Sequence, residues 1–129
     1  MHACSPGRVF DLEERTHQFA LRVRQFLRRL PRSISTESDG RQLLRASGSV
    51  GANYIEANEN VGDRDFVYRI KLCRKEAKES RYWLLLLLLD ESGPLAPERA
   101  ALATEADELT RIFAAIHRNT LAKKPPSSS

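Results

Sequence analysis

The chain has 129 residues, 29% of them charged and 41% hydrophobic, with a formal net charge of +4. This length suits one domain with its own core, and the mild positive charge is compatible with a polyanionic partner without establishing one. Two cysteines without Cys-x-x-Cys or Cys/His spacing argue against a zinc motif and a disulfide framework, and they favour a reducing cytoplasm.

The first periodic segment, residues 11–30, predicts a helix that follows an N-terminal arm of residues 1–10. Asp11 and Glu14 have capping-box spacing, and Pro31 ends the segment. Residues at alternating spacings of four and three form one seam, namely Leu12, Thr16, Phe19, Val23, Phe26 and Leu30. A second face carries arginines at seven-residue intervals, and we treat these as candidate nucleic-acid contacts: Arg15, Arg22 and Arg29.

The second helix is expected over residues 37–58. Its predicted core positions are Leu43, Leu44, Ser47, Val50, Gly51, Tyr54 and Ile55. It contains the stretch GSVGANYIEANEN, in which Gly48 and Gly51 each cost helix stability, about 1 kcal/mol relative to alanine. Gly48 and Ala52 lie four residues apart, as do Ser47 and Gly51. Small residues at this spacing let another helix approach closely, so we expect tight packing here.

Asn53 and Glu56 lie three residues apart in the same stretch and share a helix face. A buried carboxylate must be paired, and Arg69 or Arg74 of the next helix could supply the partner. We therefore interpret Gly48, Gly51, Asn53 and Glu56 as a structural motif, with a ligand site as the alternative.

The third helix is expected over residues 64–91, because Ser92-Gly93-Pro94 would stop it. Six consecutive leucines, residues 84–89, cover every side of such a helix, although a bundle helix normally buries one stripe. Leu84 and Leu87 belong to the internal seam, which runs through Phe66, Ile70, Cys73, Ala77, Ser80, Leu84 and Leu87. We expect the others to contact another subunit, with a thick core at one end of the bundle as the alternative: Leu85, Leu86, Leu88 and Leu89.

The same helix carries a basic sector. At about 100° per residue, five cations fall within about 120° of one another, apart from the seam and from Glu76 and Glu79. They are candidate phosphate contacts: Lys71, Arg74, Lys75, Lys78 and Arg81. The alternative is a solvated face with intrahelical ion pairs, such as that between Lys75 and Glu79. Aromatic stacking platforms for single strands are not obvious in the sequence, and Tyr82 is the best exposed candidate.

A fourth helix is expected over residues 97–121, and residues 123–129 form a tail predicted to be disordered. The fourth seam is Leu102, Ala106, Leu109, Phe113, Ile116 and Thr120. Four helices with short connections predict an all-α fold, an up-down-up-down antiparallel four-helix bundle over residues 11–122. No apolar run is long enough to cross a membrane.

Catalytic and metal-binding patterns are not evident. The three histidines are scattered, and the sequence contains no His-Glu-x-x-His, P-loop or Gly-x-Gly-x-x-Gly. A di-iron bundle would need Glu-x-x-His motifs paired on facing helices, and no such pair exists. We therefore expect a protein that is not an enzyme and that has no metal or cofactor.

Several residues carry a resemblance to a known family. They are Gly51-Ala52-Asn53, Glu56, the turn at Gly62, Phe66, and the run from Lys75 to Leu84. Over residues 46–89 the chain resembles the bacterial four helix bundle protein family. That family includes proteins encoded by intervening sequences in large-subunit ribosomal RNA genes and the accessory variability proteins of diversity-generating retroelements. Members often have Ile-Ala-Glu-Gly where this chain has Tyr54-Ile55-Glu56-Ala57. The resemblance implies a helical cytosolic protein without enzyme activity that assembles as a ring, typically a homopentamer.

These observations favour a non-enzymatic oligomeric scaffold or accessory protein that binds RNA or DNA through basic helix faces, without strong sequence preference. A reverse transcriptase is a candidate partner. The alternative is a protein-protein interaction module whose charge only keeps it in solution.

Overall fold

The computed structural model describes residues 12–59 and 62–123, and all of its secondary structure in these ranges is helical. The helices are α1 (Leu12–Arg28), α2 (Ile34–Glu59), α3 (Asp63–Leu86) and α4 (Ala96–Lys123). The all-α prediction is therefore confirmed for the described part of the chain. The predicted N-terminal arm, residues 1–10, and most of the predicted tail lie outside the described residues, although α4 continues to Lys123.

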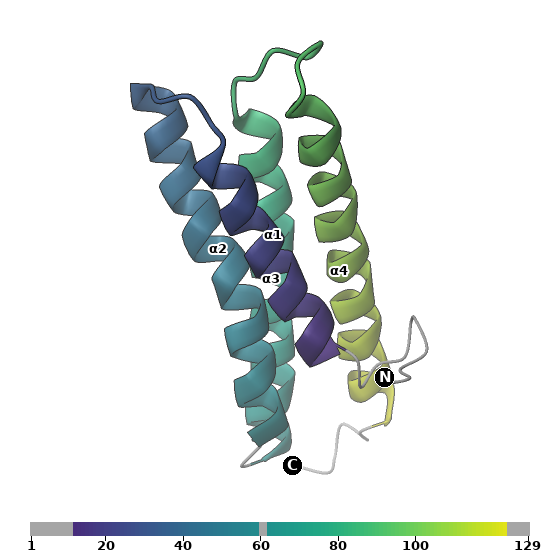
Figure 1. The fold of residues 1–129 in the computed structure, drawn as a ribbon. Coiled ribbons are helices and arrows are strands. Elements are labelled where there is room, and N and C mark those ends of the chain that lie inside the picture. Colours follow the sequence, from purple (N-terminus) through teal and green to yellow (C-terminus); the bar gives the residue numbers. More distant parts are fainter. Residues whose placement is uncertain (1–11, 60–61, 124–129) are drawn as a thin grey trace.

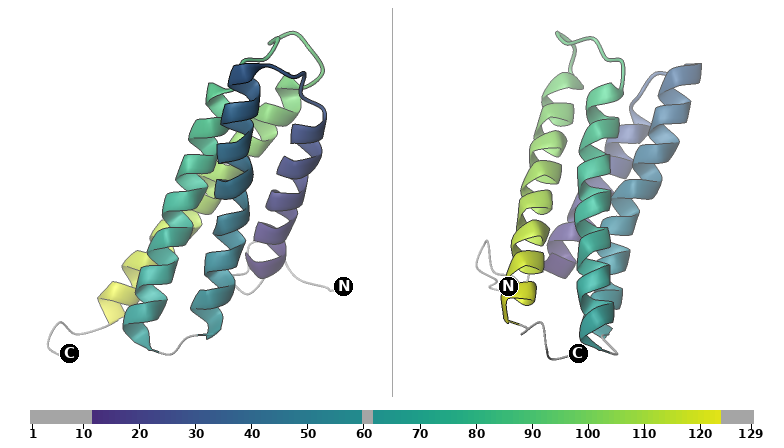
Figure 2. Two further views of the ribbon diagram at one scale, coloured as in Figure 1. Left: turned by 90° about the vertical axis from the view of Figure 1, so that its left-hand side faces the viewer. Right: turned by 180° about the vertical axis from the view of Figure 1, so that it is seen from behind.

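The four helices lie side by side, and each packs against two others (Figures 1 and 2). α2 lies against α1 and α3, and α4 lies against α3 and α1, whereas no Cα atom of α1 lies within 8 Å of one in α3. The connections from α1 to α2 and from α3 to α4 lie at the same end of the molecule (Figure 1). α1 and α3 therefore occupy opposite corners, and the outer face of α3 points away from α1.

The core lies along the four predicted seams. Phe19 and Phe26 of α1, Ile70 of α3 and Phe113 of α4 are all 0–1% exposed. Most of the remaining seam residues are buried as well, because spacings of three and four keep them on the inner face. Leu44 and Ile55 were predicted to be core residues, but they are 39% and 49% exposed, because they lie on the flank of α2 outside its buried stripe.

Two helix ends differ from the prediction by three residues or more. α2 begins three residues earlier than expected, at Ile34, because the Ser33 hydroxyl accepts a hydrogen bond from the Thr36 backbone N–H at 3.1 Å and caps the helix. α3 ends at Leu86, five residues before the predicted end, and Leu87 has extended backbone angles (φ −56°, ψ 133°). The last three leucines of the run, residues 87–89, therefore lie beyond the end of α3.

Arg99 explains why α3 can end there. This arginine is only 8% exposed, and one of its guanidinium nitrogens lies 2.8 Å from the Leu87 carbonyl oxygen and 3.4 Å from that of Leu84. The guanidinium also pairs with Glu91 in the following turn. Carbonyls at the end of a helix have no partner within the helix, so a side chain from α4 supplies one.

At Gly51, α1 packs closely against α2. A Cβ atom added at this position would lie 3.0 Å from Thr16 Oγ1 and 3.4 Å from Thr16 Cβ. Thr16 is 1% exposed, and its hydroxyl donates to the Leu12 carbonyl at 2.7 Å, so it has little room to move. At Gly48 the added atom would meet only the end of the Arg24 side chain, at 3.2 Å.

Alanine is therefore expected to have opposite effects at these two glycines. Gly48→Ala should raise the free energy of unfolding, by up to about 1 kcal/mol, because it removes a helical glycine and displaces a flexible side chain. Gly51→Ala makes the same local gain but pushes α1 away, and overpacking costs about 1–3 kcal/mol. Urea unfolding of the two variants provides the comparison. Equal stabilisation by both would show that α1 and α2 are not tightly packed at Gly51.

Cys73 sits in the core between α3 and α2. Its side chain is 0% exposed, and its thiol donates to the Val50 carbonyl of α2, with sulfur and oxygen 3.5 Å apart. Burial disfavours the thiolate and raises the pKa of this thiol to about 12. Cys73 therefore packs as a small apolar residue at neutral pH.

Candidate nucleic-acid interface on α3

The outer face of α3 carries five exposed cations, which we call the α3 basic face: Lys71, Arg74, Lys75, Lys78 and Arg81. Lys75 pairs with Glu79 at 3.4 Å and with Glu76 at 3.7 Å. The other four have no carboxylate within 4.0 Å among residues 12–59 and 62–123. The structure therefore brings the predicted sector together on one accessible surface and leaves most of its charge unneutralised.

The acidic edge of α3 is occupied by α2 and by Lys75. Arg45 of α2 reaches across the helix interface, with one nitrogen 3.5 Å from Glu76 and another 3.6 Å from Glu79. Glu76 is 7% exposed, so this carboxylate needs its cationic neighbours. These ion pairs hold α2 against α3 and keep the glutamates from neutralising the rest of the basic face.

Four members of the α3 basic face, all except Arg81, also line a shallow groove whose described lining residues all belong to α3. Tyr68 and Tyr82 lie towards its two ends, with Leu72, Arg74 and three lysines between them along the helix. Glu79 also lines the groove, where it pairs with Lys75. The two tyrosines are 55% and 57% exposed. Tyr82 was singled out from the sequence. Tyr68 was not, although its position, three residues before Lys71 on an outward face, is a signal that could have found it.

The predicted arginines of α1 lie elsewhere. Arg15 binds Glu105 of α4 through two hydrogen bonds, of 2.7 and 2.9 Å, and also binds Glu108 at 2.7 Å. The hydrogen bond to Glu105 is the main cause of the raised pKa of Arg15. Arg22 lies 3.6 Å from Glu98 of α4, and Arg29 is exposed just beyond α1. Two of these three arginines thus link α1 to α4, at the corner opposite the α3 basic face.

Asn53 connects α2 to α3. Its amide nitrogen donates to the Ser49 carbonyl at 2.9 Å, and its amide oxygen accepts a hydrogen bond from Arg69 at 3.1 Å. Glu56 was expected to be buried and paired, but it is exposed. That expectation was wrong, because Glu56 falls just outside the interface while Asn53, one turn earlier, receives the arginine.

Asn53→Ala is expected to lower the free energy of unfolding by about 1–2 kcal/mol, because Arg69 loses its hydrogen-bond acceptor. The Arg69 side chain already has one unsatisfied donor, because its Nε is buried without a hydrogen-bond partner in the described residues. Glu56→Ala serves as the control on the same helix and should stay within about 0.5 kcal/mol of the parent. Thermal unfolding of both variants measures the difference, and a larger loss from Glu56→Ala would contradict the described geometry.

The four leucines predicted to lie at a subunit interface separate into two groups. Leu85, Leu86 and Leu88 are 49%, 43% and 73% exposed, whereas Leu89 packs against the core. The exposed three, which we call the leucine patch, are adjacent in sequence to the end of the α3 basic face.

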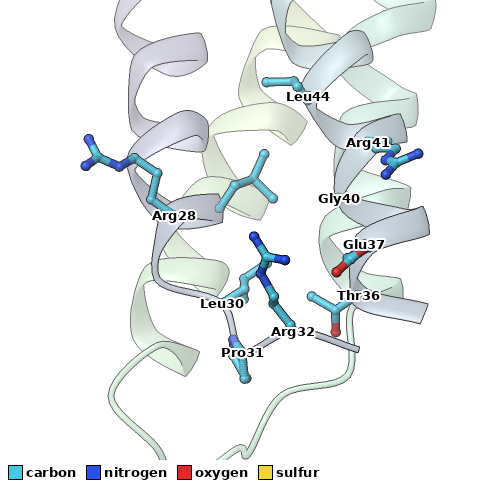
Figure 3. Close-up of a pocket in the computed structure, with 10 residues that line it drawn as sticks. Arg28, Leu30, Pro31, Arg32, Thr36, Glu37, Gly40, Arg41 and Leu44 are labelled. Carbon is cyan, nitrogen blue, oxygen red and sulfur yellow. The ribbon is translucent and has the colours of Figure 1, made fainter. Parts of the chain in front are cut away.

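A second basic groove lies between the end of α1 and the start of α2. Arg32 extends between these elements, with Leu30 beside it, while Arg28 and Arg41 point outward (Figure 3). Glu37 lies on the same groove and opposes binding of an anion there. These arginines come from two elements and share no helical spacing, so the sequence pattern does not indicate that they lie together.

Within the described ranges, no three His, Cys, Asp or Glu side chains are grouped so that they could hold a metal ion. None of the described helices is long and apolar enough to cross a membrane.

Comparison with known proteins identifies the family. The model of the 23S rRNA-intervening sequence protein family matches residues 9–115. The chain belongs to this family. The assignment made from residues 46–89 is thereby confirmed for the intervening-sequence proteins, and the match extends it over α1 and most of α4. The retroelement branch stays a prediction. No curated protein matches the chain.

A solved structure agrees with this assignment. A protein of unknown function from the S23 ribosomal protein family of Bacteroides thetaiotaomicron is 25% identical to this intervening-sequence family member, with a TM-score of 0.67. The alignment covers 82% of this chain and 97% of the other. The helical arrangement therefore spans nearly the whole relative.

Proposed function

We propose that this protein is a non-enzymatic accessory or scaffold protein that binds nucleic acid through the α3 basic face, without strong sequence preference. The observation that carries the proposal is the cluster of four exposed cations without a carboxylate partner among the described residues: Lys71, Arg74, Lys78 and Arg81. Such clusters attract phosphate backbones and carry no base-specific information. The family description contains 23S rRNA, which makes RNA the first ligand to test.

The proposal includes assembly. An up-down-up-down bundle that forms a homo-oligomeric ring, with a pentamer as the expected form, would present the α3 basic face once per subunit in the cytoplasm. The leucine patch supports this, because exposed apolar clusters of this kind mark interfaces. Subunits acting on one strand add their contacts, so weak single-subunit binding becomes strong. A reverse transcriptase is a candidate partner of the assembly.

Removing charge from the α3 basic face tests the proposal. The triple variant Arg74→Gln, Lys78→Gln, Arg81→Gln should bind mixed-sequence RNA and DNA more weakly than the parent. The slope of log affinity against log salt should become shallower by about 2 to 3, since each neutralised phosphate contributes about 0.7 to 0.9. Fluorescence anisotropy at several salt concentrations measures both quantities, and light scattering checks that assembly is unchanged.

The matched control removes equal charge from the second groove through Arg28→Gln, Arg32→Gln and Arg41→Gln. If this control loses as much affinity as the α3 variant, binding follows net charge rather than the α3 basic face. The second candidate function is a protein-protein interaction module without a nucleic-acid role, and the leucine patch is the observation that favours it. A parent protein that binds neither RNA nor DNA at low salt would leave that function as the better account.

A further inference from the structure

The aromatic residues of the α3 groove add something that charge alone does not provide. Tyr68 and Tyr82 are separated by fourteen residues, which is nearly four helical turns, so at about 100° per residue they lie only about 40° apart around the axis. The rise along the helix places them about 21 Å apart. They therefore flank one stripe of the surface, and Lys71, Lys75 and Lys78 lie between them in the same groove.

Both rings are partly exposed to solvent, and each has a neighbouring side chain that restricts its position. Tyr68 and Tyr82 are 55% and 57% exposed. The Arg69 guanidinium lies 6.0 Å from the centroid of the Tyr68 ring, and the Tyr82 ring meets Trp83 edge to face, with centroids 5.0 Å apart and planes at 75°. Trp83 itself packs against the core. Each tyrosine ring is therefore restricted by a neighbour while about half of the residue stays exposed. Such a surface is suited to stacking of another planar group.

We propose that Tyr68 and Tyr82 form a stacking platform for the bases of single-stranded nucleic acid, with the lysines between them contacting its backbone. A basic groove combined with exposed aromatic rings is typical of proteins that bind single strands without sequence preference. Duplex nucleic acid keeps its bases stacked inside the helix and cannot use such a platform. This inference rests on the proposed function and adds a preference for single strands over duplexes.

Trp83 provides an optical readout, because it is the only tryptophan of the chain and touches Tyr82. A single strand that stacks on Tyr82 should change the fluorescence of Trp83 during a titration with a short oligothymidylate. The same change should be absent during a titration with a short duplex of mixed sequence at equal phosphate concentration.

Ring replacement tests the platform directly. Tyr68→Leu and Tyr82→Leu should each weaken oligothymidylate binding about fivefold or more, since stacking contributes about 1–3 kcal/mol per base, and should leave duplex binding unchanged. Tyr68→Phe and Tyr82→Phe keep the ring and serve as matched controls, with single-strand binding close to that of the parent. Both tyrosines are half exposed, so the leucine variants should fold, which circular dichroism confirms.

The outcomes separate this inference from the proposed function. A parent protein that binds neither single strands nor duplexes overturns both. A parent protein that binds nucleic acid while the leucine variants keep its single-strand affinity overturns the platform and leaves the basic face standing. Equal losses for single strands and duplexes would also overturn it, because stacking cannot account for weaker duplex binding.

Discussion

Arg99→Ala is expected to lower the free energy of unfolding by about 3 kcal/mol, which corresponds to a decrease in melting temperature on the order of 10 °C. The reason is that this 8% exposed guanidinium supplies hydrogen bonds to the carbonyls of Leu84 and Leu87. Without it these groups lose their partner and a cavity opens at the end of α3. Urea unfolding of the parent and the variant measures the loss.

The matched control is Arg111→Ala on the same helix. The Arg111 side chain is 79% exposed, and among the residues that the structure describes it pairs only with Asp107, so its loss should cost at most about 0.5 kcal/mol. Arg99→Lys should fall between the two, because one ammonium group cannot reproduce the planar fork of a guanidinium. Similar stability of the Arg99→Ala variant and its control would mean that the end of α3 does not depend on Arg99.

The double variant Leu85→Glu, Leu88→Glu is expected to convert the proposed ring into monomers of about 14.6 kDa. Both side chains are about half exposed or more, so glutamate adds little strain to the single chain. Within an apolar subunit interface, however, the same carboxylates would be buried without partners, which costs several kcal/mol per contact. Light scattering at micromolar concentration reports the mass directly.

Leu121→Glu provides the comparison for this test. Leu121 is 51% exposed and lies near the end of α4, far along the chain from the leucine patch. This variant should assemble like the parent protein. A parent protein that is already monomeric would rule out the ring, and loss of assembly in Leu121→Glu alone would place the subunit contact at another surface.

The helices and their inner faces could be predicted from the sequence because both follow from local periodicity. Thr16, Cys73 and Ser80 are small or polar, yet the seam spacing places them inside, and all three are buried. The end of α3 could not be predicted in this way, since Ser92-Gly93-Pro94 is a strong stop signal, whereas the actual end depends on an arginine of α4. Arg99 continues the α4 seam three residues before Leu102, a pattern that could have indicated a buried position.

In the candidate site, too, features within one helix could be predicted, whereas contacts between helices could not. Residues of one helix were placed correctly on a shared face, because the angle between them follows from their spacing. The pairing of Arg15 with Glu105 depends on how α1 meets α4, and no local pattern encodes it. For the same reason Glu56 was expected at an interface that in fact uses Asn53.

The buried thiol of Cys73 can report how often the helices of the bundle separate. A water-soluble thiol reagent can reach this sulfur only when α2 and α3 come apart, because the side chain is 0% exposed. With the other cysteine of the chain, Cys4, replaced by serine, the rate of labelling at neutral pH would therefore measure how often the two helices separate. Comparison of the labelling rate with and without RNA would show whether a ligand bound to the outer face of α3 slows the separation of α3 from α2.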